Sequence, residues 1–277
     1  MHTTHFISNL NIQTAYHDKG EGHPFVLVHG FTGSKLDFQD QLGWFSNLRR
    51  VIAYDQRGHG ESSNTGPYTF QQLVDDLMNF LDRLQIDTCD LLGHSLGGMV
   101  AMRAVLAHPE RFSSLILMDT SPMPIEIFPQ GVHDQLIELV EREGCEALVG
   151  MMRGQPASPA QQLGVDYLGE LEHWRRISAK LSQMDPQAFT ELAQQLAAAD
   201  SLLTQLAELN CPTTIVVGAK DDPFIEASSK MGDSIPGASV VTIAQAGHSP
   251  QYENAEAWRE AITAHLTDRS RVRSSGE

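Results

Sequence analysis

The sequence has few cysteines, no surplus of basic residues and no long hydrophobic run. Each of these absences excludes a class of protein or of binding partner. Its three cysteines, Cys89, Cys145 and Cys211, are too few and too widely spaced for a disulfide framework or a zinc cluster. We therefore expect all three to be small buried or half-buried residues in a reducing compartment. Lysines and arginines number 19 against 35 aspartates and glutamates, a formal net charge of −16. With no cationic surplus to neutralise phosphates, neither nucleic acid nor an anionic membrane surface is an expected partner.

The N-terminal stretch M-H-T-T-H-F-I-S-N-L lacks both the basic and the apolar region of a signal peptide. No apolar run approaches the ~20 residues that a membrane-spanning helix needs. We therefore expect a cytoplasmic protein. Its 277 residues can bury one large core, or one core with an inserted part.

Short apolar runs alternate with helical patterns in both halves of the chain. Runs typical of buried strands occupy 25–28, 50–54, 90–92, 115–118, 213–218 and 239–244. Helical patterns occupy 69–84, 96–108, 224–232 and 253–266. This alternation predicts an α/β fold with a mostly parallel central sheet flanked by helices.

The alternation stops between the two halves. Helical segments punctuated by prolines are expected there, around 132–142, 145–152, 160–168, 170–184 and 186–199. We predict an α/β core formed by 1–121 and 201–277, and an inserted all-helical cap formed by 122–200.

The pentapeptide G93-H-S-L-G97 joins the strand at 90–92 to the helix at 96–108. A serine that only capped the helix would not need glycines two residues before and two residues after it. We interpret the motif as a tight, strained turn that holds the Ser95 hydroxyl clear of the backbone as a nucleophile. A Cβ at either glycine would collide with the neighbouring chain.

A serine hydroxyl needs a base, and the base needs an orienting acid. Among 12 histidines, His248 alone combines a strand-end loop, a preceding glycine and a position late in the chain. Asp221 and Asp222 both follow the strand at 213–218, and either could be the acid. The order serine, aspartate, histidine is the one expected on this kind of sheet.

Two backbone N–H groups are candidates for an oxyanion hole. Leu96 offers one from the start of its helix, and Phe31 offers the other from the loop H29-G-F-T-G-S34. The charged segment D55-Q-R-G-H-G-E-S62 is interpreted instead as a structural turn that Arg57 and His59 hold by hydrogen bonds.

Five motifs together resemble the α/β-hydrolase superfamily: H29-G-F-T-G-S, D55-Q-R-G-H-G-E-S, G93-H-S-L-G-G, G218-A-K-D and G247-H-S-P-Q-Y-E. They are most similar to its small microbial branch of carboxylesterases, lactonases, carbon–carbon bond hydrolases and menaquinone-pathway enzymes. The resemblance implies an α/β-hydrolase fold with Ser95 as nucleophile, His248 as base, Asp221 as acid, and Phe31 and Leu96 as oxyanion donors. No cofactor and no metal ion is expected.

The expected activity is cleavage of carboxylic esters of small, mainly apolar substrates through an acyl-enzyme. Alternatives on the same triad are a lactonase, a carbon–carbon bond hydrolase of β-diketones or ring-cleavage products, and a menaquinone-pathway type of elimination enzyme. That last group usually has an arginine where this sequence has Met99. A perhydrolase and a non-catalytic binding module are further alternatives.

The substrate pocket is expected mainly in the cap. Candidate lining residues are Met99, Met123, Phe128, Met151, Met152 and Trp174. Arg175 and Arg176, beside Trp174, could hold a carboxylate, as cap residues do in the carbon–carbon hydrolases that the sequence resembles. We favour the interpretation that they belong to a solvated helix face.

Overall fold

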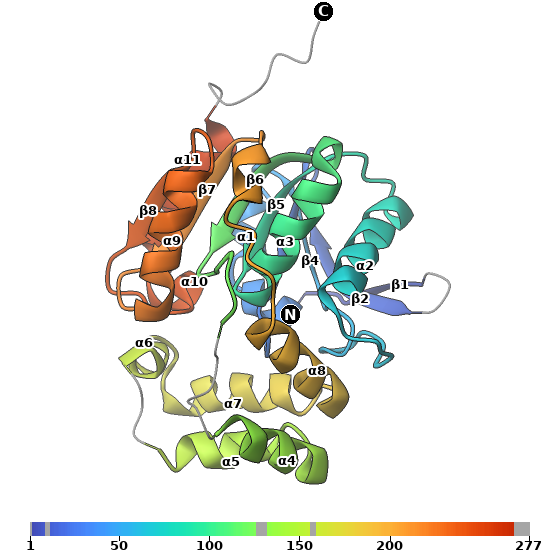
Figure 1. The fold of residues 1–277 in the computed structure, drawn as a ribbon, viewed down its shortest axis with the longest axis vertical. Coiled ribbons are helices and arrows are strands. Elements are labelled where there is room, and N and C mark those ends of the chain that lie inside the picture. Colours follow the sequence, from blue (N-terminus) through green and yellow to red (C-terminus); the bar gives the residue numbers. More distant parts are fainter. Residues whose placement is uncertain (1, 9–11, 126–131, 156–158, 269–277) are drawn as a thin grey trace, which may run out of the picture.

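A computed structural model describes residues 2–8, 12–125, 132–155 and 159–268 (Figure 1). Its eight strands form one sheet in the order β1-β2-β4-β3-β5-β6-β7-β8. They are β1 (His5–Ser8), β2 (Gln13–Lys19), β3 (Pro24–Val28), β4 (Arg50–Tyr54), β5 (Cys89–His94), β6 (Phe112–Met118), β7 (Thr213–Gly218) and β8 (Ser239–Ile243). The pairs β1–β2 and β2–β4 are antiparallel and the others are parallel, so the predicted mostly parallel sheet is confirmed.

The two N-terminal strands, β1 and β2, were not expected from the sequence. Three of the four residues of β1 are exposed, and the buried positions of β2 include the polar side chains of Thr14 and His17. Without a run of apolar residues, neither strand has the signal that identified the other six.

Helices cover both faces of the sheet. The helices associated with the sheet are α1 (Leu42–Phe45), α2 (Phe70–Arg83), α3 (Leu96–Ala107), α9 (Asp222–Ser234) and α11 (Ala255–Thr267), joined by the short α10 (Pro250–Glu253) and the 3-10 turns η1 (Lys35–Phe38), η2 (Pro109–Arg111) and η3 (Gln205–Glu208). In β3, Val26 and Val28 pack in the same cluster as α2 and α3, whereas Phe25 and Leu27 pack with α1 and α11. Burial on both faces explains why the central strands are continuous apolar runs.

In the part of the chain that the structure describes, five α-helices lie between β6 and β7. They are α4 (His133–Glu143), α5 (Ala147–Arg153), α6 (Pro159–Leu168), α7 (Glu170–Leu181) and α8 (Pro186–Ala197), and Figure 1 shows them gathered beyond one end of the sheet. Between β6 and β7 the described residues contain no strand, in agreement with the predicted helical segments. The division into core and cap stays a prediction.

Two predictions from composition can be compared directly with the fold. Cys89, Cys145 and Cys211 are all buried. None of the described helices has both the length and the apolar character that crossing a bilayer requires.

Candidate active site

Ser95 occupies a strained turn between β5 and α3. Its φ of 52° and ψ of −117° lie in a region that side chains other than glycine seldom adopt. The end of β6 holds this turn on both sides: the Ser95 N–H donates to the Met118 carbonyl at 2.9 Å, and the Thr120 hydroxyl donates to the Ser95 carbonyl at 2.6 Å. The Ser95 side chain makes no helix-capping hydrogen bond, so the residue does not act as a simple N-cap.

The two glycines of the pentapeptide are required by close backbone contacts. A Cβ on Gly93 would lie 2.3 Å from the carbonyl oxygen of Gly97. A Cβ on Gly97 would lie 2.4 Å from the carbonyl oxygen of Val28 on β3. Neither backbone oxygen can swing aside as a flexible side chain would, so both positions need glycine for α3 to pack this close to the sheet.

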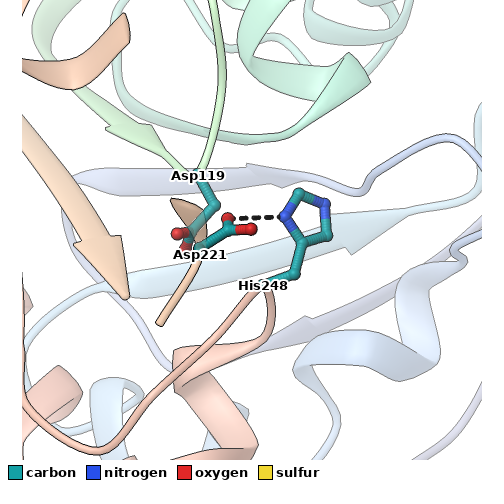
Figure 2. A group of neighbouring side chains, drawn as sticks. All are labelled: Asp119, Asp221 and His248. Atoms are coloured by element: carbon teal, nitrogen blue, oxygen red, sulfur yellow. Dashed lines mark hydrogen bonds and ion pairs between the residues drawn. The ribbon is translucent and has the colours of Figure 1, made fainter. Parts of the chain in front are cut away.

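His248 and Asp221 form a hydrogen-bonded pair beyond the ends of β8 and β7 (Figure 2). The imidazole Nδ1 lies 2.8 Å from Asp221 Oδ2. Because the carboxylate accepts, Nδ1 donates, and in the neutral ring this leaves Nε2 as a proton acceptor. Asp221 is buried whereas Asp222 is exposed in the first turn of α9, so the fold brings only Asp221 to the imidazole.

His94 connects the Ser95 turn to the His248 loop. Its Nε2 donates to the His248 carbonyl at 2.7 Å, and the two imidazole centroids lie 4.9 Å apart. Burial lowers the pKa of His94 to about 3, so the ring is neutral at pH 7. The Ser95 hydroxyl itself makes no hydrogen bond among the described residues. The turn and the base are therefore joined through His94 and not by a direct hydrogen bond.

The predicted oxyanion donors, Phe31 and Leu96, lie on the two loops that flank Ser95. Leu96 is the first residue of α3, and the loop after β3 is so close that a Cβ on Gly30 would lie 3.2 Å from the Ser95 Cβ. Within the described part of the chain, the N–H groups of Phe31 and Leu96 make no hydrogen bond. Both therefore remain able to bind an oxyanion.

The charged segment after β4 is structural, as the sequence indicated. Arg57 forms a buried ion pair with Asp76 and donates to the Thr65 carbonyl at 2.9 Å. The His59 Nε2 donates to the Phe31 carbonyl. The segment thus fixes the loop that carries Phe31, one of the two candidate oxyanion donors.

A cavity of about 620 Å³ lies beside His248 and Phe31. Its walls are mainly apolar side chains from α4, α5, α7 and α8, among them Leu136, Leu148, Met152, Ile177 and Phe189. A volume of this size is typical of a small-molecule site. A hydrophobic substrate group would be held here, next to the candidate base.

Of the five predicted pocket residues that the structure describes, Met151 and Met152 line this cavity and the other three do not. Met99 is fully buried in the core, as are most residues of α3. Met123 is half-buried outside the cavity lining, with its N–H bonded to the Ser121 hydroxyl. Phe128 lies outside the described residues.

Trp174 lies on the face of α7 that is turned away from the cavity. It faces a separate hollow and packs under the guanidinium of Arg153, 5.1 Å from the ring centroid. The cavity-facing residues of α7 recur at helical spacing, at His173, Arg176, Ile177, Lys180 and Leu181. Helical phase therefore excludes Trp174 from the pocket.

Arg176 and Lys180 bring positive charge to the cavity wall. The sequence favoured a solvated helix face for Arg176, which is wrong for this residue, and gave no signal for Lys180. Arg176 pairs with Asp40 at 2.7 Å and with Glu172 at 2.8 Å. Lys180 pairs with Asp37 at 2.7 Å. Burial raises the pKa of Asp37, but the charge and hydrogen bond of Lys180 outweigh this effect, and the pKa lies below its ordinary value. Both cations are already neutralised by carboxylates.

Asp119 is a third acid beside the pair, and no motif predicted it. Asp119, Asp221 and His248 each have one oxygen or nitrogen atom that could bind a metal ion, and these three atoms lie within 4.8 Å of one another (Figure 2). Because Asp221 and His248 already hydrogen-bond to each other, the cluster is better described as an acid–base group than as a metal site. One feature of the sequence could have identified Asp119. It directly follows the apolar strand β6, just as Asp221 lies three residues after the end of β7.

Comparison with known proteins finds similarity over most of the chain. Residues 25–261 match the model of a family described as the alpha/beta hydrolase family. The 3-oxoadipate enol-lactonase 2 of Acinetobacter baylyi is 27% identical over 250 residues, covering 87% of this chain and 88% of that protein. The 2-hydroxymuconate semialdehyde hydrolase of Pseudomonas putida is 27% identical over 270 residues, covering 95% and 93%. A thermophilic esterase from Thermogutta terrifontis superposes with a TM-score of 0.80 at 28% identity, covering 95% and 98%.

Proposed function

The chain belongs to the alpha/beta hydrolase family, in its small microbial branch, and we propose that it is a serine hydrolase that cleaves carboxylic esters with apolar acyl groups. One observation carries the proposal: His248, hydrogen-bonded to Asp221, borders an apolar cavity, and its loop is bonded to His94, next to the strained Ser95. Nucleophile, base and acid then come from the ends of three different strands.

In the first half of the proposed reaction, His248 Nε2 removes the Ser95 proton while the serine oxygen attacks the ester carbonyl. The N–H groups of Phe31 and Leu96 bind the oxyanion, and each such donor is worth about 2.7–4 kcal/mol of barrier. The carbon–oxygen bond to the alcohol then breaks, and the alcohol leaves with the proton from His248. Asp221 stabilises the imidazolium throughout.

In the second half, water attacks the acyl-enzyme and gives its proton to His248. The bond to Ser95 breaks, the serine oxygen takes the proton back, and the carboxylic acid leaves. The same base therefore acts twice, and no cofactor is required by this scheme.

The residues that line the cavity favour a substrate with an apolar, uncharged acyl group. A substrate carboxylate would have to displace Asp40 or Asp37 from Arg176 or Lys180, because both cations already have partners. A neutral chain can pack against Leu148, Met152 and Ile177 without breaking an ion pair.

The test is a kinetic and labelling experiment on Ser95→Ala. The variant should lose at least 10³-fold in kcat/KM for p-nitrophenyl butyrate, about the size expected when a covalent nucleophile is removed. A fluorophosphonate should label the unmodified protein on the peptide containing Ser95. Ser113→Ala, at an exposed serine on β6, is the matched control and should keep full activity. Full turnover by Ser95→Ala would refute the proposal.

Cleavage of a lactone or of a carbon–carbon bond in an anionic substrate is the second candidate. Arg176 and Lys180 favour it, since both lie on the cavity face of α7 and would hold a carboxylate if their partners moved. Turnover of a carboxylated enol-lactone or a vinylogous diketone faster than any neutral ester would favour this candidate.

A further inference from the structure

Asp119 is a buried carboxyl group that the proposed reaction does not use. It directly follows β6, and its side chain is fully buried. Its φ of 44° places it in the left-handed region, which is uncommon for a residue other than glycine. The Asp119 N–H donates to the Val216 carbonyl at 2.9 Å, so pairing with β7 holds this conformation.

The backbone around Asp119 joins the nucleophile turn to the acid turn. The residues on either side of it, Met118 and Thr120, bond to the N–H and the carbonyl of Ser95. Asp119 Oδ1 accepts the Gly218 N–H at 2.8 Å, at the end of β7 and three residues before Asp221. A single residue therefore lies between the two turns whose relative position sets the geometry of the site.

The second oxygen of Asp119 lacks an ordinary partner. Among the described residues, no donor reaches Asp119 Oδ2, although a buried oxygen of this kind is almost always bonded. Figure 2 shows the Asp119 carboxyl beside that of Asp221. Two carboxyl groups can hydrogen-bond to each other only when one of them carries a proton.

The surroundings favour the proton on Asp119. The ionisable groups that face it are Asp221 from the turn before α9, Glu253 from α10, and His248 from the loop before α10. Burial raises the pKa of Asp119 well above its ordinary value, and the negative charge of Asp221 raises it further. Asp221 is the one of the two that is bonded to the imidazole, so it is the better site for the charge.

We propose that Asp119 remains a neutral carboxylic acid and donates a hydrogen bond from Oδ2 to the Asp221 carboxylate. It is then a positioning residue: it holds Asp221 toward His248 and withdraws part of the negative charge that the imidazole experiences. The expected effect on rate rests on the proposed function. The protonation state of Asp119 does not depend on the proposed function.

The test compares two replacements of similar size. In Asp119→Asn, the side-chain amide would accept from Gly218 and donate to Asp221, as a neutral acid does, so this variant copies the proposed state. Asp119→Leu fills the space with neither bond. For p-nitrophenyl butyrate, Asp119→Leu should lower kcat about tenfold with little change in KM. It should also move the acid limb of kcat/KM to higher pH, because the full charge of Asp221 keeps the proton on His248.

Asp119→Asn should bring kcat back to within about threefold and return the acid limb to its original pH. An equal loss in both variants, or an acid limb that moves in neither, would overturn the proposal. A purely structural role would lower activity without moving the pH profile.

A second measurement does not require Asp119→Leu to fold. In protein carrying ¹³C-labelled aspartate carboxyls, one resonance should keep the protonated shift at pH 7 and be missing from Asp119→Asn. If that resonance shows an ionised carboxylate, the proposal is wrong. If Ser95→Ala retains full turnover while the resonance is protonated, the proposed function fails and the protonation of Asp119 stands.

Discussion

Replacing Gly97 with alanine tests the packing of the nucleophile turn most directly. The added Cβ would lie 2.4 Å from the Val28 carbonyl oxygen and 2.6 Å from that of His29. Both contacts are to backbone of β3 and the residue after it, so α3 must move away from the sheet. Overpacking of this severity costs about 3 kcal/mol, at the upper end of the usual range.

The helical position of Gly97 offsets part of this cost. Alanine is favoured over glycine inside a helix by about 1 kcal/mol, so the net destabilisation of Gly97→Ala is about 2 kcal/mol. In a protein of this size, that corresponds to a fall in Tm of roughly 4–8 °C. The protein should still be folded at 25 °C.

Activity should fall much further than stability. A shift of α3 by a few tenths of an ångström moves the Leu96 N–H and the Ser95 hydroxyl together, and we expect kcat/KM to fall about 100-fold. Circular dichroism melting and p-nitrophenyl butyrate turnover measure the two effects.

The matched control is Gly150→Ala, in α5. No atom lies within 4 Å of a Cβ placed there, so the same substitution should stabilise the protein by about 0.4–1 kcal/mol. If Gly97→Ala melts at or above the temperature of the parent, or if the two variants change Tm in the same direction, the packing explanation is wrong.

Three further predictions concern the acid, the buried His29 and the cavity. Asp221→Asn should lower kcat by about 10³- to 10⁴-fold, whereas Asp222→Asn, at an exposed position, should stay within twofold; equal losses would contradict the assignment. Burial lowers the pKa of His29 to about 3, so the stability that its neutral ring provides is complete above pH 6.5 and is lost as the pH falls toward 3. The free energy of unfolding, from urea titrations between pH 6 and pH 4, should therefore fall less steeply in His29→Gln, by about 1.4 kcal/mol per pH unit. Across p-nitrophenyl esters from acetate upward, each added methylene should raise kcat/KM roughly fourfold until the cavity is full, whereas an acyl chain ending in a carboxylate should react at least about 100-fold more slowly than the neutral chain of equal length.

The sequence predicted the central sheet and the candidate triad for a physical reason. Strands buried on both faces are continuous apolar runs, and the glycines around Ser95 are explained by backbone contacts that any side chain would block. β2 was not predicted because its buried positions include the polar residues Thr14 and His17, so the strand lacks a continuous apolar run.

Pocket residues were harder to predict because apolar spacing does not say which face of a helix meets a ligand. Apart from Arg103, α3 is apolar all round, so Met99 could not be assigned to a cavity or to the core by its type. On α7, Trp174 and Ile177 are both apolar, yet only Ile177 faces the cavity. Asp119 gave no motif, since an aspartate after a strand is more often a turn former.

The ion pairs of α7 tie the substrate range to residues outside the helical segment. Lys180 and Arg176 find their partners at Asp37 and Asp40, in and just after η1. A helical segment grafted from a relative would bring new pocket walls but would leave the buried carboxylate of Asp37 uncompensated, which is strongly destabilising. Chimeras that exchange this segment should therefore carry positions 37 and 40 with it, since the pocket walls and η1 share these ion pairs.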